Sequence, residues 1–172
     1  MNILVTGGSA SGKSEYAENL ALRLGGPLFY IATMKPWDQE CLARIEKHRR
    51  QRAGKGFETV ECYGDLSDVA LPRRGTVLLE CMGNLTANVL FADAPSHDPE
   101  QAVMQGLSHL QGQCGHLVVV TNEVFSDGRC YDAETTRYLR LLAALNAHMG
   151  RTFDAVTEVV CGIALAQKGA LL

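Results

Sequence analysis

Residues 2–14, NILVTGGSASGKS, decide the fold. The first five are mostly apolar or β-branched and predict a short buried strand. Residues 7–14 then match the pattern G-x-x-x-x-G-K-S/T in full, and the amphipathic segment 14–24 predicts a helix directly after them. A strand, a glycine-rich turn and a helix in this order form the context in which such a loop binds phosphate.

Each residue type in this loop suits a nucleoside triphosphate. Glycines let the backbone bend so that successive N–H groups point at phosphate oxygens, and the helix N-terminus adds the positive end of its dipole. Lys13 can reach the β- and γ-phosphates, and the Ser14 hydroxyl can bind Mg²⁺. The alternative, a glycine-rich turn with an unrelated lysine, leaves the flanking strand and helix unexplained. The sequence therefore predicts a triphosphate site.

The remaining apolar segments indicate an α/β fold. Strands are expected at residues 28–32, 58–62, 76–80, 117–121 and 155–161, and helices at about 37–52, 85–91, from 98 onward and at 133–149. Because the core strands are continuously apolar, both of their faces should be buried, which predicts a mostly parallel sheet flanked by helices. Since no linker or repeat interrupts the chain, we expect one domain over residues 1–172.

The composition excludes several other classes of protein. The chain has 172 residues and a net charge of -3, which argues against a nucleic-acid partner. No apolar run is long enough to span a bilayer, and the first residues lack the basic start of a signal peptide, so we expect neither a membrane span nor a signal peptide. The six cysteines show no C-x-x-C pair, which predicts free thiols, with Cys81 and Cys161 buried in apolar runs.

A phosphate loop of this kind needs a carboxylate near its metal, at the end of a neighbouring strand. Glu80 follows the run TVLL, and Glu123 follows VVVTN. We expect Glu80 to serve the nucleotide and metal with Ser14, and Glu123 to lie on the substrate side. Either carboxylate could instead cap a helix or pair with an arginine.

Residues 43–52, ARIEKHRRQR, place His48 among five cationic side chains. On a helix, Leu42 and Ile45 share a face with His48, Arg49 and Arg52, so the two apolar residues should form a core stripe with the histidine at its margin. Nearby arginines favour the neutral imidazole and could hold a triphosphate, which would make the ring a nucleophile. A solvated basic helix end remains the alternative at this point.

Taken together, these motifs resemble one known family. The segments ILVTGGSASGKSEYAE, FYIAT, ARIEKHRRQR, TVEC, VLLECMGNLTANVLF and VVVTNEV are similar to those of the bifunctional adenosylcobinamide kinase / adenosylcobinamide-phosphate guanylyltransferases. The resemblance implies a RecA-like P-loop fold, a cytoplasmic homotrimer and a late role in adenosylcobalamin assembly. It also implies GTP and ATP as substrates with Mg²⁺, and adenosylcobinamide and its phosphate as partners.

The resemblance also implies roles for individual residues. His48 matches the histidine that becomes covalently guanylylated, with Lys13 as the second catalytic residue. The nucleotide contacts would be Gly7, Gly8, Ser9, Ala10, Ser11, Gly12, Lys13, Ser14, Thr33, Met34, Lys35, Arg49, Arg50, Gln51, Arg52, Glu61 and Glu80. One departure follows Val124, where family members commonly continue with G-x-G-I-V-P and this chain reads FSDGR. Contacts with the corrinoid that the family would make through this segment are therefore not assigned to residues of this chain.

Two alternatives to this function stay open. The first is a single-function P-loop kinase for a small metabolite, in which His48 is only structural. The second is a nucleotide-switched binding module that grips RNA or DNA with the basic segment 44–55. The acidic balance of the chain and the lack of aromatic residues between the cations argue against the second alternative.

Overall fold

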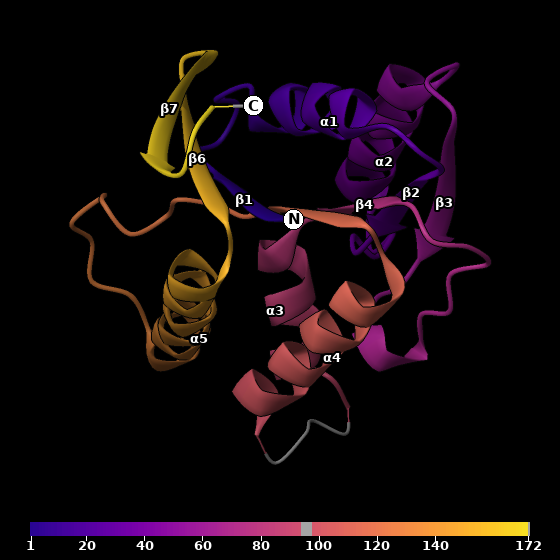
Figure 1. The fold of residues 1–172 in the computed structure, drawn as a ribbon. Helices are drawn as coiled ribbons and strands as arrows, with labels where there is room; N and C mark the ends of the chain where they lie inside the picture. The colour runs from indigo at the N-terminus through magenta and orange to yellow at the C-terminus, as the bar shows by residue number, and fades with distance from the viewer. Residues whose placement is uncertain (94–97, 172) are drawn as a thin grey trace.

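The computed structural model describes residues 1–93 and 98–171, and these build one seven-stranded sheet with helices on both faces (Figure 1). The strand order is β3-β2-β4-β5-β1-β6-β7, and all pairs are parallel except β6 with β7. The strands are β1 (Asn2–Thr6), β2 (Leu28–Ala32), β3 (Phe57–Glu61), β4 (Thr76–Glu80), β5 (His116–Val120), β6 (Ala155–Val160) and β7 (Ile163–Lys168). The predicted α/β class with a mostly parallel sheet is confirmed.

The helices divide between the two faces of this sheet. They are α1 (Lys13–Leu24), α2 (Gln39–Arg52), α3 (Met82–Leu90), α4 (Pro99–Gln113) and α5 (Ala133–Thr152), with a 3₁₀ turn at Leu66–Asp68. In Figure 1, α1 and α2 lie above the sheet and α3, α4 and α5 below it. No helix of the described residues is long and apolar enough to cross a membrane.

Alternating side chains of the buried strands fill two separate cores. On β2, Phe29 and Ile31 pack with α3, α4 and α5, whereas Tyr30 faces α1 on the opposite side of the sheet. Phe29 and Ile31 are fully buried and Tyr30 is 4% exposed. Burial of each such side chain contributes on the order of 2 kcal/mol, so the two cores hold the central strands rigidly. The ends of these strands are therefore fixed platforms for functional groups.

The end of the chain differs from the prediction. The last strand was expected to run to Cys161, but β6 ends at Val160 and a seventh strand, β7, returns antiparallel to it. Cys161 and Gly162 form the tight turn with φ of 50° and 79°. Cys161 is thus exposed, and the expectation that it is buried was wrong, whereas Cys81 is buried. All six cysteines are free thiols, as predicted.

Helix α2 also departs from its expected packing. It begins at Gln39, where the Asp38 carboxylate caps the N-terminus by accepting a hydrogen bond from the Cys41 N–H at 2.7 Å. Leu42 is 44% exposed, so the prediction of a core stripe in the first half of the helix was wrong. The one buried residue of α2 is Arg52 at its last position. The helix is polar along most of its surface and is therefore anchored at its C-terminal end.

Candidate nucleotide site

The glycine-rich loop connects β1 to α1 at the carboxyl edge of the sheet. A Cβ atom on Gly7 would lie 2.5 Å from the carbonyl oxygen of Val159, and Gly12, just before the helix, has a φ of 92°. Both positions therefore require glycine. Lys13, Ser14 and Glu15 form the first turn of α1, where the free N–H groups of the helix can meet an anion.

Lys13 bends back over this loop. Its Nζ donates a hydrogen bond to the carbonyl oxygen of Gly8 at 2.9 Å, and the residue is 9% exposed. Burial lowers the pKa of Lys13, and the nearby Cys81 and Glu80 partly offset this effect. The positive charge of Arg44 on α2 adds to the lowering of the Lys13 pKa. The phosphate oxygens of a bound nucleotide would place negative charge beside Lys13 and Arg44.

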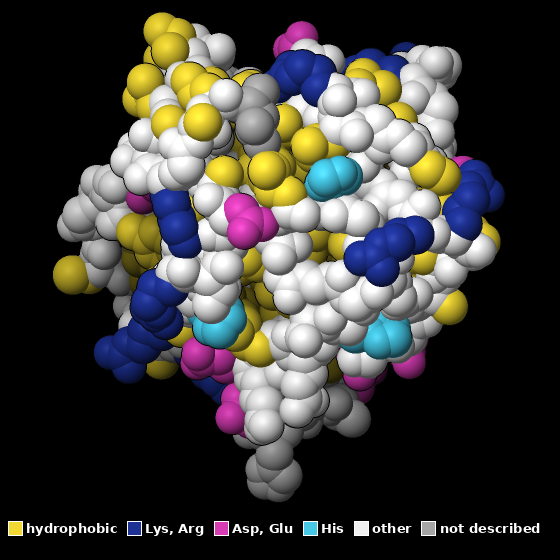
Figure 2. Space-filling model, viewed as in Figure 1, with side chains coloured by type: hydrophobic (Ala, Val, Ile, Leu, Met, Phe, Trp, Pro, Cys, Tyr) yellow, Lys and Arg dark blue, Asp and Glu magenta, His cyan; other side chains and the backbone are white. Residues whose placement is uncertain are grey.

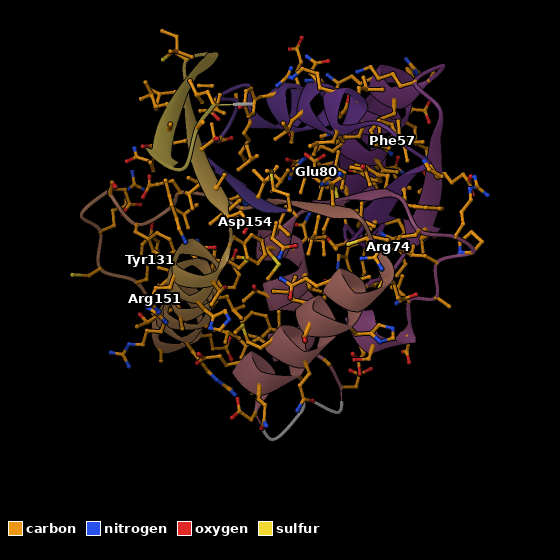
Figure 3. The ribbon with its side chains drawn as sticks, viewed as in Figure 1. Phe57, Arg74, Glu80, Tyr131, Arg151 and Asp154 are labelled. Carbon is orange, nitrogen blue, oxygen red and sulfur yellow. The ribbon has the colours of Figure 1, made fainter. Side chains whose placement is uncertain are left out.

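Glu80 lies at the end of β4, beneath α1 (Figure 3). Its Oε1 accepts a hydrogen bond from the Ser14 hydroxyl, and its Oε2 accepts one from the Tyr30 hydroxyl at 3.2 Å. A hydroxyl and a carboxylate are hard oxygen ligands of the kind that Mg²⁺ prefers. No group of three or more metal-binding side chains occurs among the described residues. The donor set therefore fits Mg²⁺ held by two protein oxygens and the phosphates of a nucleotide.

His48 lies on α2, half-buried, and its Nδ1 is buried without a hydrogen-bond partner. Four residues on, the guanidinium carbon of Arg52 stacks 3.3 Å from the centre of the Tyr30 ring, and its Nη1 is also buried without a partner. Buried polar groups are normally hydrogen-bonded, so unsatisfied atoms in a native structure call for an explanation. A polar ligand between α2 and the sheet would provide one.

The other residues expected to bind nucleotide on α2 point in different directions. Arg49 forms an ion pair with Glu61 at 3.1 Å, and Tyr63 donates a hydrogen bond to the same carboxylate at 2.8 Å. Arg50 pairs with Glu46 of its own helix at 2.9 Å and, like Gln51, faces solvent. The structure therefore joins Arg49 to Glu61 and directs Arg52 inward, but it leaves Arg50 and Gln51 away from the loop.

The segment after β2 contributes one structural residue and two accessible ones. Thr33 is fully buried, and its hydroxyl accepts a hydrogen bond from the Cys81 N–H at 2.7 Å and donates one to the Cys81 carbonyl at 2.9 Å. Thr33 thus fixes the chain beside Glu80. Met34 and Lys35 are half-buried, and Lys35 borders a pocket of about 360 Å³ together with Tyr63 and other residues.

The carboxylate of Glu123 forms hydrogen bonds within its own loop. Its Oε1 accepts hydrogen bonds from the Phe125 N–H at 3.0 Å and the Ser126 hydroxyl at 2.9 Å, both in its own loop. Its backbone N–H donates to the Gly7 carbonyl at 3.0 Å. The expected role of Glu123 on the substrate side stays a prediction, and in this structure its Oε1 stabilises a turn.

Sequence reasoning missed Tyr30, which contacts both Arg52 and Glu80. It also missed Glu18 of α1, which is 2% exposed and pairs with Lys55 at 2.6 Å. Tyr30 lies in the segment FYIAT, but nothing in that segment's pattern sets the tyrosine apart from the apolar residues of its strand. The signal for Glu18 was a carboxylate on the apolar face of α1, four residues after Ser14.

Comparison with known proteins identifies the family of this chain. A family model described as cobinamide kinase / cobinamide phosphate guanyltransferase matches residues 3–167. The bifunctional adenosylcobalamin biosynthesis proteins CobU of Salmonella typhimurium and Escherichia coli K12 are each 34% identical to this chain over 184 residues, which cover 98% of the chain and 100% of the relative. The corresponding CobP protein of Pseudomonas aeruginosa is 30% identical over 175 residues, with 98% of each chain covered.

These matches run through the phosphate loop, the histidine helix and the strand that ends at Glu80. They confirm the resemblance drawn from the motifs. The chain therefore belongs to the cobinamide kinase / cobinamide phosphate guanyltransferase family.

Proposed function

We propose that this protein phosphorylates adenosylcobinamide with ATP or GTP and then transfers GMP from GTP to the product, giving adenosylcobinamide-GDP for adenosylcobalamin biosynthesis. The observation that carries this proposal is the position of Glu80. Its carboxylate contacts Ser14 of the phosphate loop and, through Tyr30, the guanidinium of Arg52 on the histidine helix. The Glu80 carboxylate thus connects the phosphate loop, which the kinase step needs, with the histidine helix, which the transferase step needs.

In the kinase step, the phosphate loop holds the triphosphate of the nucleotide. The hydroxyl of the aminopropanol arm of adenosylcobinamide attacks the γ-phosphorus, the bond from this phosphorus to the bridging oxygen breaks, and the proton of the hydroxyl is released. Lys13 and the N–H groups at the start of α1 stabilise the charge that develops on the transferring group. Mg²⁺, held by Ser14 and Glu80, would neutralise further charge on the β- and γ-phosphates.

In the transferase step, a ring nitrogen of His48 attacks the α-phosphorus of GTP. A P–N bond forms and the P–O bond to pyrophosphate breaks, which leaves GMP on the histidine. A phosphate oxygen of adenosylcobinamide phosphate then attacks the same phosphorus, and the nitrogen regains its lone pair as the P–N bond breaks. Splitting one difficult transfer into two steps is the logic of covalent catalysis. Arg49, next to His48, and Arg52, one turn further along α2, would supply positive charge for the triphosphate.

Labelled GTP tests this proposal. With α-labelled GTP, the wild-type protein should retain label after denaturation, and the label should be acid-labile and alkali-stable. His48→Ala should retain none, yet it should still move the γ-phosphoryl group to adenosylcobinamide. His148→Ala is the matched control because His148 is also half-buried but lies on α5, on the other face of the sheet. Equal labelling of wild type and His48→Ala, or no label in either, would refute the transferase step.

The same experiment separates the two alternatives. A single-function kinase would transfer the γ-phosphoryl group and never retain GMP. A nucleotide-switched module would neither transfer the γ-phosphoryl group nor retain GMP. It would bind oligonucleotides with an affinity that falls steeply as salt rises.

The proposal includes a cytoplasmic homotrimer whose subunits are single domains over residues 1–172. Edge strand β7 supports self-association, since Val160, Ile163 and Leu165 around the β6–β7 turn are 44%, 64% and 45% exposed. Figure 2 shows hydrophobic side chains gathered over this hairpin at the upper left. Sedimentation equilibrium should give three times the 18.7 kDa of one chain, and a monomer at micromolar concentration would contradict the trimer.

A further inference from the structure

Tyr30 occupies the point between the two halves of the proposed site. It is 4% exposed on β2, with its side chain on the face that α1 and α2 cover. The Arg52 guanidinium lies 3.3 Å from its ring centre, and Phe57 meets the ring edge-on at a centroid distance of 6.5 Å. Its hydroxyl donates to Glu80 Oε2 at 3.2 Å. A single side chain therefore touches the histidine helix with its face and the loop carboxylate with its tip.

The contacts of Tyr30 with Arg52 and with Glu80 both involve a charged partner, which makes them stronger than contacts between neutral groups. A guanidinium stacked on an aromatic ring away from water is a favourable cation–π pair, and Arg52 is 7% exposed. A hydrogen bond to a carboxylate is stronger than one between neutral groups.

Arg52 is also the principal anchor of its helix. No other residue of α2 is buried, and Leu42 in the first half is 44% exposed. The position of His48, one turn before Arg52, therefore depends on how Arg52 is held. Because the Arg52 Nη1 makes no hydrogen bond, the tyrosine ring is its main support.

We propose that Tyr30 is a positioning residue that sets α2 and His48 relative to the phosphate loop. Its ring holds Arg52 and thereby the helix, and its hydroxyl fixes the orientation of the Glu80 carboxylate beside Ser14. This inference rests on the proposed function, since it assigns His48 and Glu80 to the same nucleotide. It adds a residue that acts through its neighbours and touches no reacting atom.

Two substitutions separate the ring from the hydroxyl. Tyr30→Phe keeps the platform for Arg52 and removes only the donor to Glu80. We expect it to raise the KM for GTP about tenfold, as for loss of a hydrogen bond to a charged group, while the rate of His48 guanylylation at saturating GTP stays within about twofold. Tyr30→Leu removes the platform as well. Its guanylylation rate should fall about 30-fold further than its kinase rate, as for loss of a buried cation–π pair.

GTP serves both assays, so that one nucleotide reports both reactions: α-label retained on the protein, and γ-label transferred to adenosylcobinamide. The control is Phe29→Leu, a neighbouring aromatic whose side chain is fully buried on the opposite face of β2. It should lower both rates in proportion if it lowers them at all. Proportional losses in Tyr30→Leu would mean that the tyrosine is merely structural and would overturn the inference.

Amide hydrogen exchange gives a readout that needs no turnover. Tyr30→Leu should speed exchange in residues 49–55 with little change in the core strands, and Tyr30→Phe should not. If Tyr30→Leu does not fold, Arg52→Met removes the same contact from the other side and should give the same local increase. Unchanged exchange in both would overturn the inference. Absence of label in wild type would instead refute the proposed function, and the exchange result would still decide whether Tyr30 holds α2.

Discussion

The phosphate loop and the histidine helix lie side by side but are held in opposite ways. The charged groups at the loop are buried and hydrogen-bonded: Lys13 is 9% exposed and donates to Gly8, and Glu80 of β4 is 8% exposed and accepts from Ser14. One loop side chain, the Ser11 hydroxyl, is buried without a partner. Helix α2 is mostly exposed, and it is anchored through Arg52 at its last residue. Two of its buried side-chain atoms, His48 Nδ1 and Arg52 Nη1, lack hydrogen-bond partners.

This difference indicates a division of labour. A preorganised loop can stabilise charge without reorganising at the moment of reaction, which suits phosphoryl transfer. A helix with few buried contacts opens at low free energy, so its final position can depend on the ligand. We therefore expect changes in the loop to affect both reactions strongly. Changes in α2 should act mainly on the step that uses His48.

The largest effect should come from Lys13→Met. Removing the ammonium from the phosphate loop takes away charge that stabilises both transfers, so kinase and guanylylation rates should each fall by about 10³-fold. Lys47→Met is the matched control because Lys47 is exposed on α2, and both rates should stay within about twofold. Steady-state kinetics with labelled GTP measure both. A loss of guanylylation alone in Lys13→Met would show that the two reactions do not share the loop.

The structure of the phosphate loop could largely be predicted from the sequence, whereas the packing of α2 could not. The loop motif carries its geometry in its residue types, since glycines, a lysine and a hydroxyl at set spacing specify a phosphate cradle. Strands β2 and β4 were predicted to the residue because continuous apolar runs have clear ends. The start of α3 was placed three residues late, because its cap, Cys81, makes no side-chain hydrogen bond that a sequence pattern could reveal.

The other differences between the predicted and the observed structure also have physical causes. Strand β7 was missed although its first four residues are apolar, because only Cys161 and Gly162 separate it from β6. The packing of α2 was misread because Leu42 and Ile45 follow a helical rhythm, yet the helix contacts the body through a cation on an aromatic ring. Such a contact joins residues far apart in the chain and has no spacing to detect. Strand order is likewise a property of crossovers that apolar patterns leave open.

A smaller effect should follow from Lys55→Met, which tests how the loop after α2 is attached to α1. Lys55 pairs with Glu18, which is 2% exposed, at 2.6 Å. Removing the lysine leaves a buried carboxylate unpaired and should lower the free energy of unfolding by about 3 kcal/mol. Arg50→Met breaks the exposed pair with Glu46 and should cost less than about 0.5 kcal/mol. Denaturant unfolding measures both, and equal costs would mean that burial of Glu18 adds nothing.

The smallest effect concerns the pH dependence of stability in the nucleotide-free protein. Burial lowers the pKa of Lys13 in the folded state below its ordinary value of 10.5, so between the two pKa values the unfolded chain binds more protons than the folded one. Stability contributed at this position must therefore rise with pH through that window. The free energy of unfolding of wild type minus that of Lys13→Met should increase as pH approaches 10.5. GTP places anionic phosphates beside the ammonium and raises its pKa, so saturating GTP should flatten the rise. A difference that is flat or falls with pH without nucleotide would mean that the Lys13 ammonium is not desolvated, and the preorganised loop would then lack its buried charge.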